Sequence, residues 1–321
     1  MADRNPPSFC RSLLVLLTVL LAAPLLQAQA DEAGTQDTYD LRPHFRQGQT
    51  TRYSAWTLHQ ISESMTFGPR TKTTQTRLEI EAELIWQVEH VNEDGSAKCD
   101  LTIEWMTVTA RYGDGPVKYS DSRQSSGEIE QYHRLLLAIT GKPMTFQVGA
   151  DGTIESISGT DQMRWAMGED SSEPKDLDLV ESATDMALLA AAPNKIEPGQ
   201  QWNAQFQWLH RAGKIDYHYT YTLDKVGPIA DIPIATVTAE ASLELEPDFS
   251  LFPDEAPRPH VQLTRGAVKS QVMFDLSRHE AVGRNTVQTH TIEVNQDIGD
   301  LTLNVITREH VQGQVLRIAE Q

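Results

Sequence analysis

The stretch LEIEAELIWQV, residues 78–88, decides how this chain folds. Apolar side chains occupy every second position from Leu78 through Leu84 to Val88, and glutamates stand between the first of them. Successive side chains of a strand point to opposite faces of a sheet, so this spacing predicts a strand with one buried and one wet face. Such strands are typical of antiparallel sheets, because parallel sheets are covered on both sides.

The same alternation recurs along most of the chain. Further candidate strands are residues 99–105, 215–223, 237–245, 268–276, 287–294, 301–308 and 314–319. Turn sequences separate them: Asn92–Gly95 follows the first strand, and Ala150–Gly152 lies between 144–148 and 153–157. Asp-Gly between alternating segments favours a hairpin, because glycine accepts the positive φ of a tight turn. The sequence therefore predicts a mainly β fold, with a large antiparallel sheet that is curved or forms a half-barrel.

Helical patterns are confined to mid-chain. In residues 125–141, Ser125 and Glu128 fit a capping box and Gly141 is suited to end the helix. A second apolar stripe at helical spacing spans 176–192, where Pro193 would stop it. We therefore expect a helical insertion over about 125–192 in a β domain of 39–321. The alternative is two β lobes, 39–160 and 195–321, because Gly-Gln at 48–49 and at 199–200 each precede a tryptophan-containing strand.

Residues 1–30 have the pattern of an export signal. Two arginines precede an apolar run over 13–26, and Ala28-Gln29-Ala30 supplies a cleavage pattern, so we expect the mature chain to begin at Asp31. The run is too short for an ordinary membrane span, and no stable span is expected after cleavage. Residues 31–38 read as a flexible spacer. The expected location is the periplasm or the extracellular space.

The charge of the chain excludes one class of partner. It has 27 Lys and Arg against 45 Asp and Glu, a formal net charge of −18. Nucleic-acid binding relies on basic side chains that displace counterions, so nucleic-acid partners are not expected. Once the leader is removed, Cys99 is the single cysteine, and no disulfide can form within the chain. Cys99 is expected to be buried and inert, since it alternates with apolar residues.

No motif for catalysis or for metal binding is present. The sequence lacks His-Glu-x-x-His, Cys-x-x-Cys, Gly-x-Ser-x-Gly and the glycine-rich phosphate loops. We therefore expect no cofactor, no metal, no catalytic residue and no enzymatic activity. The histidines look scattered, and His133, His279, His290 and His310 read as surface residues. A hydrolase would need acids or histidines that only the fold brings together.

Large apolar residues provide the candidate ligand-binding residues. Tryptophans on two early strands are expected to line the concave side of the sheet, and apolar residues of the two helices to face it. These candidates are Trp86, Trp105, Leu136, Ile139, Met186 and Leu189. Tryptophan also anchors ordinary β cores, and pattern alone does not separate a filled core from a cavity.

Three segments carry a resemblance to a known family. They are LRPHFRQGQTTRY at 41–53, GKPMTFQV at 141–148 with DGTI at 151–154, and IEPGQQW at 196–202. They resemble a family of exported bacterial β-proteins described as a domain of unknown function, which implies the fold and no activity. At the level of fold, the order of strands, helices and strands is similar to periplasmic lipoprotein carriers, in which a curved half-barrel wraps an apolar cavity.

These observations lead to one expected function and two alternatives. We expect an exported, non-catalytic binding or scaffold protein of the cell envelope that holds an apolar small molecule, a lipid or an acyl chain. The first alternative is a structural or protein-interaction module with a filled core, whose protein partner the sequence does not identify. A hydrolase is the second.

Overall fold

The computed structural model describes residues 37–159, 189–210, 213–247, 258–298 and 301–318. The chain divides into two units, Met1–Asp37 and Thr38–Gln321, and the description below concerns the second. The predicted cleavage site at Ala30 and Asp31 and the spacer up to residue 36 lie outside the described residues. The predicted domain boundaries therefore stay predictions.

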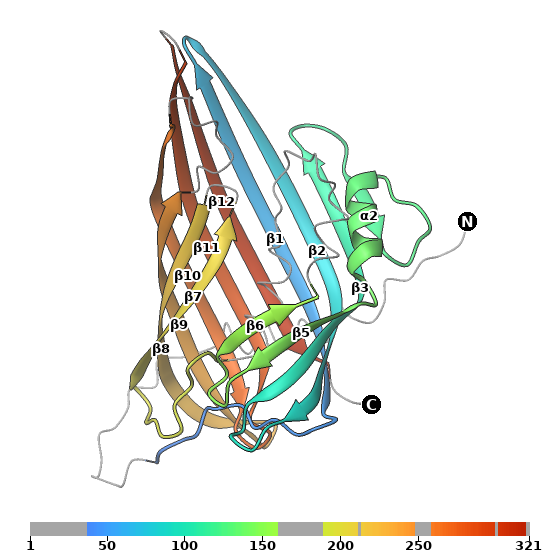
Figure 1. Ribbon diagram of the computed structural model, residues 1–321, viewed down its shortest axis with the longest axis vertical. Helices are drawn as coiled ribbons and strands as arrows, with labels where there is room; N and C mark the ends of the chain where they lie inside the picture. Colours follow the sequence, from blue (N-terminus) through green and yellow to red (C-terminus); the bar gives the residue numbers. More distant parts are fainter. Residues whose placement is uncertain (1–36, 160–188, 211–212, 248–257, 299–300, 319–321) are drawn as a thin grey trace. The chain divides into compact units, whose positions relative to one another are not determined.

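Twelve strands in the described residues form one antiparallel sheet (Figure 1), as the alternating pattern predicts. The strands are β1 (Thr50–Phe67), β2 (Arg70–Val91), β3 (Ala97–Tyr112), β4 (Lys118–Asp121), β5 (Pro143–Val148), β6 (Ile154–Ser158), β7 (Gln201–His210), β8 (Gly213–Ile229), β9 (Ile232–Pro247), β10 (His260–Asp275), β11 (Glu280–Ile298) and β12 (Leu301–Arg317). One short helix, α2 (Glu130–Ile139), lies in mid-chain.

The strand order follows the chain almost without exception. It runs β6-β5-β3-β2-β1-β12-β11-β10-β9-β8-β7, and β4 pairs with β3 at the same edge as β5. The first and last strands are neighbours, paired from Tyr53↔Arg317 to Phe67↔Leu303. The sheet is not closed into a barrel, because β6 and β7 are its two edges.

The two Gly-Gln sequences make equivalent turns at the entries to β1 and β7. The amide of Gly48 donates to the Val88 carbonyl at 2.8 Å, and that of Gly199 donates to the Leu223 carbonyl at 2.6 Å. Both glycines have positive φ, 80° and 87°, which only glycine adopts without strain. The sequence echo therefore marks two similar hairpin entries within one sheet.

A single row of register partners crosses the sheet and defines its inner face. Its members are all buried, and paired residues of an antiparallel sheet lie on the same face. The row is Met106, Ala82, Ala55, Val315, Arg284, Val272, Val237 and Leu223. We call the face that carries this row the inner face. It includes every residue that lies an even number of positions from the row along the same strand, up to a bulge, and every residue paired with such a residue on the next strand.

The inner face is concave between β8 and β11. These strands are three positions apart, about 14 Å across a flat sheet at about 4.8 Å per strand. Yet Gln288 on β11 donates from Nε2 to the hydroxyl of Tyr217 on β8 at 3.0 Å. Side chains from so distant strands meet only if the sheet curves around this face, which confirms the predicted curvature.

A bulge corrects the predicted position of Trp105. The register shifts between Glu83 and Leu84, so that Leu84 pairs with Ile103 while Glu83 pairs with Trp105. The extra residue in β3 places Trp105 on the face opposite Trp86, where its Nε1 donates to Glu83 at 3.0 Å. The guanidinium of Arg123 lies 4.4 Å from the centroid of the Trp105 ring. Trp105 therefore does not line the concave side.

The first predicted helix is shorter than expected. Instead of capping the helix, Glu128 pairs with β4: its backbone amide donates to the Tyr119 carbonyl at 3.0 Å, and its carboxylate accepts from the Tyr119 amide at 2.8 Å. Helix α2 therefore begins at Glu130, after Ile129, without a side-chain cap. Most of 176–192 lies outside the described residues, and the described Leu189–Ala192 end is a turn, with φ 51° at Ala191.

Candidate ligand-binding face of the sheet

Two apolar clusters lie on the inner face of the sheet. The first joins β1, β2, β3 and β5 to helix α2, and includes Trp86, Leu136 and Ile139. The second joins β8, β9 and β10 to the segment before β7, and includes Leu189. Of the predicted ligand-binding residues, the structure thus brings three into one cluster and one into the other. Met186 lies outside the described residues.

Aromatic rings follow the second cluster along β7 and β8. Trp202 stacks on Tyr221 at 5.0 Å between ring centroids, and Tyr219 stacks on Tyr221 at 5.6 Å. Tyr217 stacks on Tyr219 at 6.1 Å, and Phe206 meets Tyr217 edge-on at 6.1 Å. Alternation on two paired strands produces this wall, since each ring occupies an inner-face position. The three tyrosines of this wall are almost fully buried, at 1–4% exposed.

Polar side chains occupy the inner face between the two clusters. They lie on the four central strands, β1, β12, β11 and β10, and most are buried. We call them the polar row: Thr57, His59, Thr307, Glu309, Arg284, Gln288, His290 and Ser270. Within it, Arg284 donates to Ser270 at 3.2 Å, and Gln288 donates to the Tyr217 hydroxyl at 3.0 Å. A continuous polar strip therefore divides the apolar face.

A buried carboxylate between two histidines forms the centre of the polar row. Glu309 contacts His290 Nε2 at 2.9 Å and His59 Nδ1 at 3.3 Å, one through each carboxylate oxygen. The side chains of His59, His290 and Glu309 are only 6%, 4% and 9% exposed. Burial alone would raise the pKa of Glu309, but the hydrogen bonds and charges of His290 and His59 outweigh it and hold this pKa far below its usual range.

The Glu309 carboxylate is itself a poor general acid or base. With a pKa far below neutral it stays ionised at neutral pH. It is suited to hold a fixed negative charge beside two imidazoles, and to orient a polar group of a ligand.

Sequence reasoning missed this cluster. His290 was expected on the surface and is buried, as is His133 on α2. Strand parity could have signalled it, because His290 alternates with Gln288 and Ile292 on the inner side of β11. The partners come from three strands, with His59 and Glu309 separated by 250 positions, so no local motif exists.

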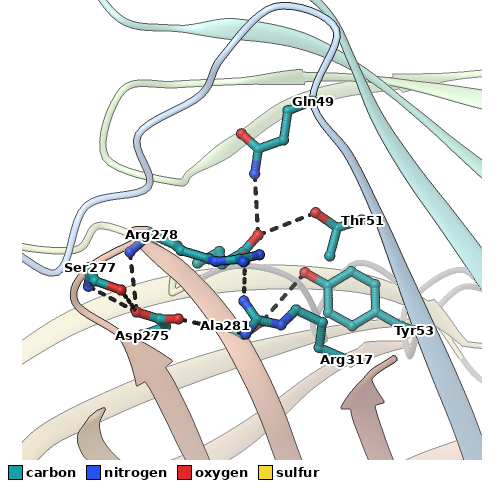
Figure 2. A network of polar contacts seen from close by, with 9 residues as sticks. Gln49, Thr51, Tyr53, Asp275, Ser277, Arg278, Ala281 and Arg317 are labelled. Carbon is teal, nitrogen blue, oxygen red and sulfur yellow. Dashed lines mark hydrogen bonds and ion pairs between the residues drawn. The ribbon is translucent and has the colours of Figure 1, made fainter. Parts of the chain in front are cut away.

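A second polar network ties the strand ends together (Figure 2). Glu280, at the start of β11, accepts hydrogen bonds from Gln49 and Thr51, each at 3.2 Å. It also forms ion pairs with Arg317 and, at 3.7 Å, with Arg278. These contacts link the first residues of β1 to the end of β12 and the start of β11. Holding these strand ends together is sufficient to account for the network.

A possible metal-ligand group lies close to this network along the chain. Asp40, His44 and His279 place one ligand atom each within 4.8 Å of one another. However, the two imidazoles stack face to face, with centroids 3.6 Å apart and planes at 19°, and Arg42 already donates to both oxygens of Asp40. A metal would have to lie in the planes of both rings, and nearly parallel planes do not converge. The group therefore fits a stacked, ion-paired cluster better than a metal site.

Comparison with known proteins adds little to this picture. No family model matches the chain, and no curated protein matches it. The chain is similar to the solved structure described as "lipid-protein interactions in lipovitellin", with 14% sequence identity and a TM-score of 0.47. The similarity covers 86% of this chain and 26% of that one, so the chain spans about a quarter of the length of that protein. A TM-score below 0.5 does not establish a shared fold, and we base no conclusion on it.

Within the part of the chain that the structure describes, no helical segment is both long and apolar enough to span a bilayer.

Proposed function

We propose that this protein is an exported, non-catalytic binding protein that holds an amphiphile against the inner face of its sheet. The apolar chain of the ligand would lie on the two apolar clusters, and its polar group would lie at the polar row. The observation that carries this proposal is the buried His59–Glu309–His290 cluster, which lies in the polar row between the two apolar clusters of the inner face.

The cost of burial is the main argument. Removing charged groups from water costs several kcal/mol per ion even after relaxation, and replacing a buried ion pair by apolar residues is often neutral or stabilising. A filled core of this size would gain nothing from the polar row, since apolar clusters flank it on both sides. A ligand with both apolar and polar parts would match all three surfaces.

The apolar surface is large enough to matter for affinity. Burial of an acyl chain is favourable by about 0.8 kcal/mol per methylene group. The stacked rings of Tyr221, Tyr219 and Tyr217 are 1%, 4% and 1% exposed, so a bound chain would contact them only in place of the groups that now cover them. Ordinary chain lengths would therefore give useful affinity without any covalent bond.

Export remains part of the proposal. It is supported by the leader pattern of residues 1–30. The periplasm or the extracellular space is the proposed location.

The experiment compares two substitutions on neighbouring positions of β9. Ala241 lies on the inner face, in register with Tyr219 and Val268, whereas Glu240 points outward and is exposed. Native mass spectrometry would look for copurified lipid, and an apolar fluorescent dye would measure binding to the purified protein. We expect ligand and dye to bind the wild type and Glu240→Phe, and Ala241→Phe to bind several-fold more weakly at unchanged stability.

Two results would contradict the proposal. One is a wild-type protein with neither copurified lipid nor dye binding. The other is an Ala241→Phe protein that loses about 1–3 kcal/mol of stability, because overpacking costs that much only where the core is already full.

A filled core would favour the second candidate, a protein-interaction module. The observation behind it is that β6 and β7 pair on one side only within the described residues. An unpaired strand edge can accept a strand from a partner. The same experiment separates the two functions, since a module of this kind would bind neither lipid nor dye.

A further inference from the structure

Two long hairpins extend beyond the strands that flank them (Figure 1). The first six residues of β2 have no partner on β3, whose pairing begins at Thr76↔Tyr112. On the other side, β11 continues past Asn295, the last of its residues that pairs with β10. Of the residues that the structure describes, those of β2, β1, β12 and β11 alone remain in the sheet at this end. We call residues 65–72 and 301–305 the hairpin tip.

The hairpin tip keeps an apolar inner face that is exposed. Phe67 pairs with Leu303, and Met65 pairs with Val305, so all four lie on the same face as the polar row. Met65, Phe67 and Leu301 are 43%, 40% and 43% exposed, in contrast to the buried apolar residues deeper in the sheet. Apolar side chains thus line the inner face again at the end of the hairpins, beyond the polar row.

The other face of the hairpin tip is polar. Hydroxyl pairs join β1 to β2 there, Ser64 with Thr73 at 2.8 Å and Thr66 with Thr71 at 3.0 Å. The tip is therefore amphipathic across the thickness of the sheet.

Charge separates between the same two faces. Arg70 pairs with Phe67 and Lys72 pairs with Met65, so both cations lie on the apolar inner face. The acids of β11 near the tip, Glu293 and Asp297, lie on the outer face by their register. On the inner face, the next acid along β1 is Glu63, two residues deeper than Met65. In a chain with a net charge of −18, cations beside exposed apolar residues form a local exception.

We infer that the hairpin tip docks on the surface of an anionic lipid bilayer. Phe67, Met65 and Leu301 would enter the boundary between headgroups and acyl chains, while Arg70 and Lys72 would contact lipid phosphates. This inference rests on the proposed function and extends it, because it names the bilayer as the partner with which the amphiphile is exchanged. The continuous inner face between tip and apolar clusters would be the path.

The test is cosedimentation of the purified protein with lipid vesicles. One set contains phosphatidylcholine with phosphatidylglycerol, and the other contains phosphatidylcholine alone. We expect binding to the anionic vesicles, weakened by salt. Arg70→Gln with Lys72→Gln should reduce binding, by about fivefold for each charge removed. Phe67→Ser with Leu301→Ser should reduce it by at least as much.

A matched control comes from another hairpin. Ile229 and Ile232 are 48% and 37% exposed and pair with each other at the turn between β8 and β9. Replacing both by serine removes a similar exposed apolar area without touching the hairpin tip. We expect vesicle binding of this control to equal that of the wild type.

Three outcomes would overturn the inference. They are no association with anionic vesicles, equal binding by wild type and both tip variants, and loss of binding in the Ile229 and Ile232 control. Binding of dispersed anionic detergent without vesicle binding would also overturn it, since the tip would then hold a single molecule. Dye binding measured without vesicles reports the proposed function separately, so retained dye binding with no vesicle binding rejects only the docking surface.

Discussion

Replacing Glu309 by glutamine tests the buried cluster at the centre of the polar row. The amide keeps the shape of the side chain but removes the charge that faces His290 and His59. At pH 7.5, where free imidazoles are neutral, we expect the free energy of unfolding to fall by about 1–3 kcal/mol, the cost of imperfectly satisfied buried polar groups.

The effect should be constant near neutral pH and shrink in acid. The folded pKa of Glu309 is lowered, so the contribution of its carboxylate to stability is present above about pH 4.3 and is lost at more acidic pH. Glutamine does not titrate, so the difference in stability between wild type and Glu309→Gln should narrow by about 1 kcal/mol between pH 5.5 and 3.5.

Urea unfolding at pH 7.5, 5.5 and 3.5, followed by tryptophan fluorescence, measures this difference. Glu240→Gln, an exposed carboxylate paired with Lys269, is the control and should change stability by less than about 1 kcal/mol at each pH. A gap between wild type and Glu309→Gln that is as wide at pH 3.5 as at pH 7.5 would refute the linkage argument.

Three further predictions concern the rest of the sheet. In urea unfolding, Gly152→Ala should lower the free energy of unfolding by about 1 kcal/mol or more beyond the loss in Gly48→Ala. Both glycines have positive φ, but a Cβ at residue 152 would lie 2.5 Å from the Leu189 carbonyl oxygen. Equal losses in the two variants would contradict this packing. Burial raises the pKa of the Cys99 thiol from 9.0 to about 12. A thiol reagent at pH 8 should therefore react quickly with Cys99 only in concentrated urea. Fast labelling of the native protein would contradict the burial of Cys99 in its strand. Glu280→Gln should lower the free energy of unfolding by about 3 kcal/mol, because it leaves Arg317 without its closest carboxylate. Thermal or urea unfolding measures this loss. An unchanged stability would mean that Asp275 replaces Glu280 as the ion-pair partner of Arg317.

Much of the fold could be predicted from alternation. The pattern at Leu78–Val88 predicted its strand, because every inner-face residue there is apolar and every outer-face residue before Ile85 is charged. The prediction was wrong where one residue changes the register, as at the Trp105 bulge. A bulge depends on how two strands pair, and neither strand signals it alone.

The polar row explains the strands that alternation predicted poorly. Strand β12 was expected as two pieces, 301–308 and 314–319, but it is continuous from Leu301 to Arg317. The pattern breaks where Glu309 and Gly313 occupy inner-face positions. On β1, His59 interrupts the apolar sequence in the same way. Alternation fails at these positions because the residue types are determined by contacts with other strands. Such local conflicts are expected at functional sites.

The pairing of β1 with β12 has a consequence for biosynthesis. A ribosome releases β1 more than 230 residues before its partner, so one side of the first strand stays open through almost the whole of translation. The pairing of β1 with β12 can form only after the last hairpin has emerged from the ribosome. Because it closes a long loop, we expect this pairing to form late in folding. A truncation that removes β12 would leave β1 and β11 as bare edges in the centre of the molecule, a hazard for intermolecular aggregation.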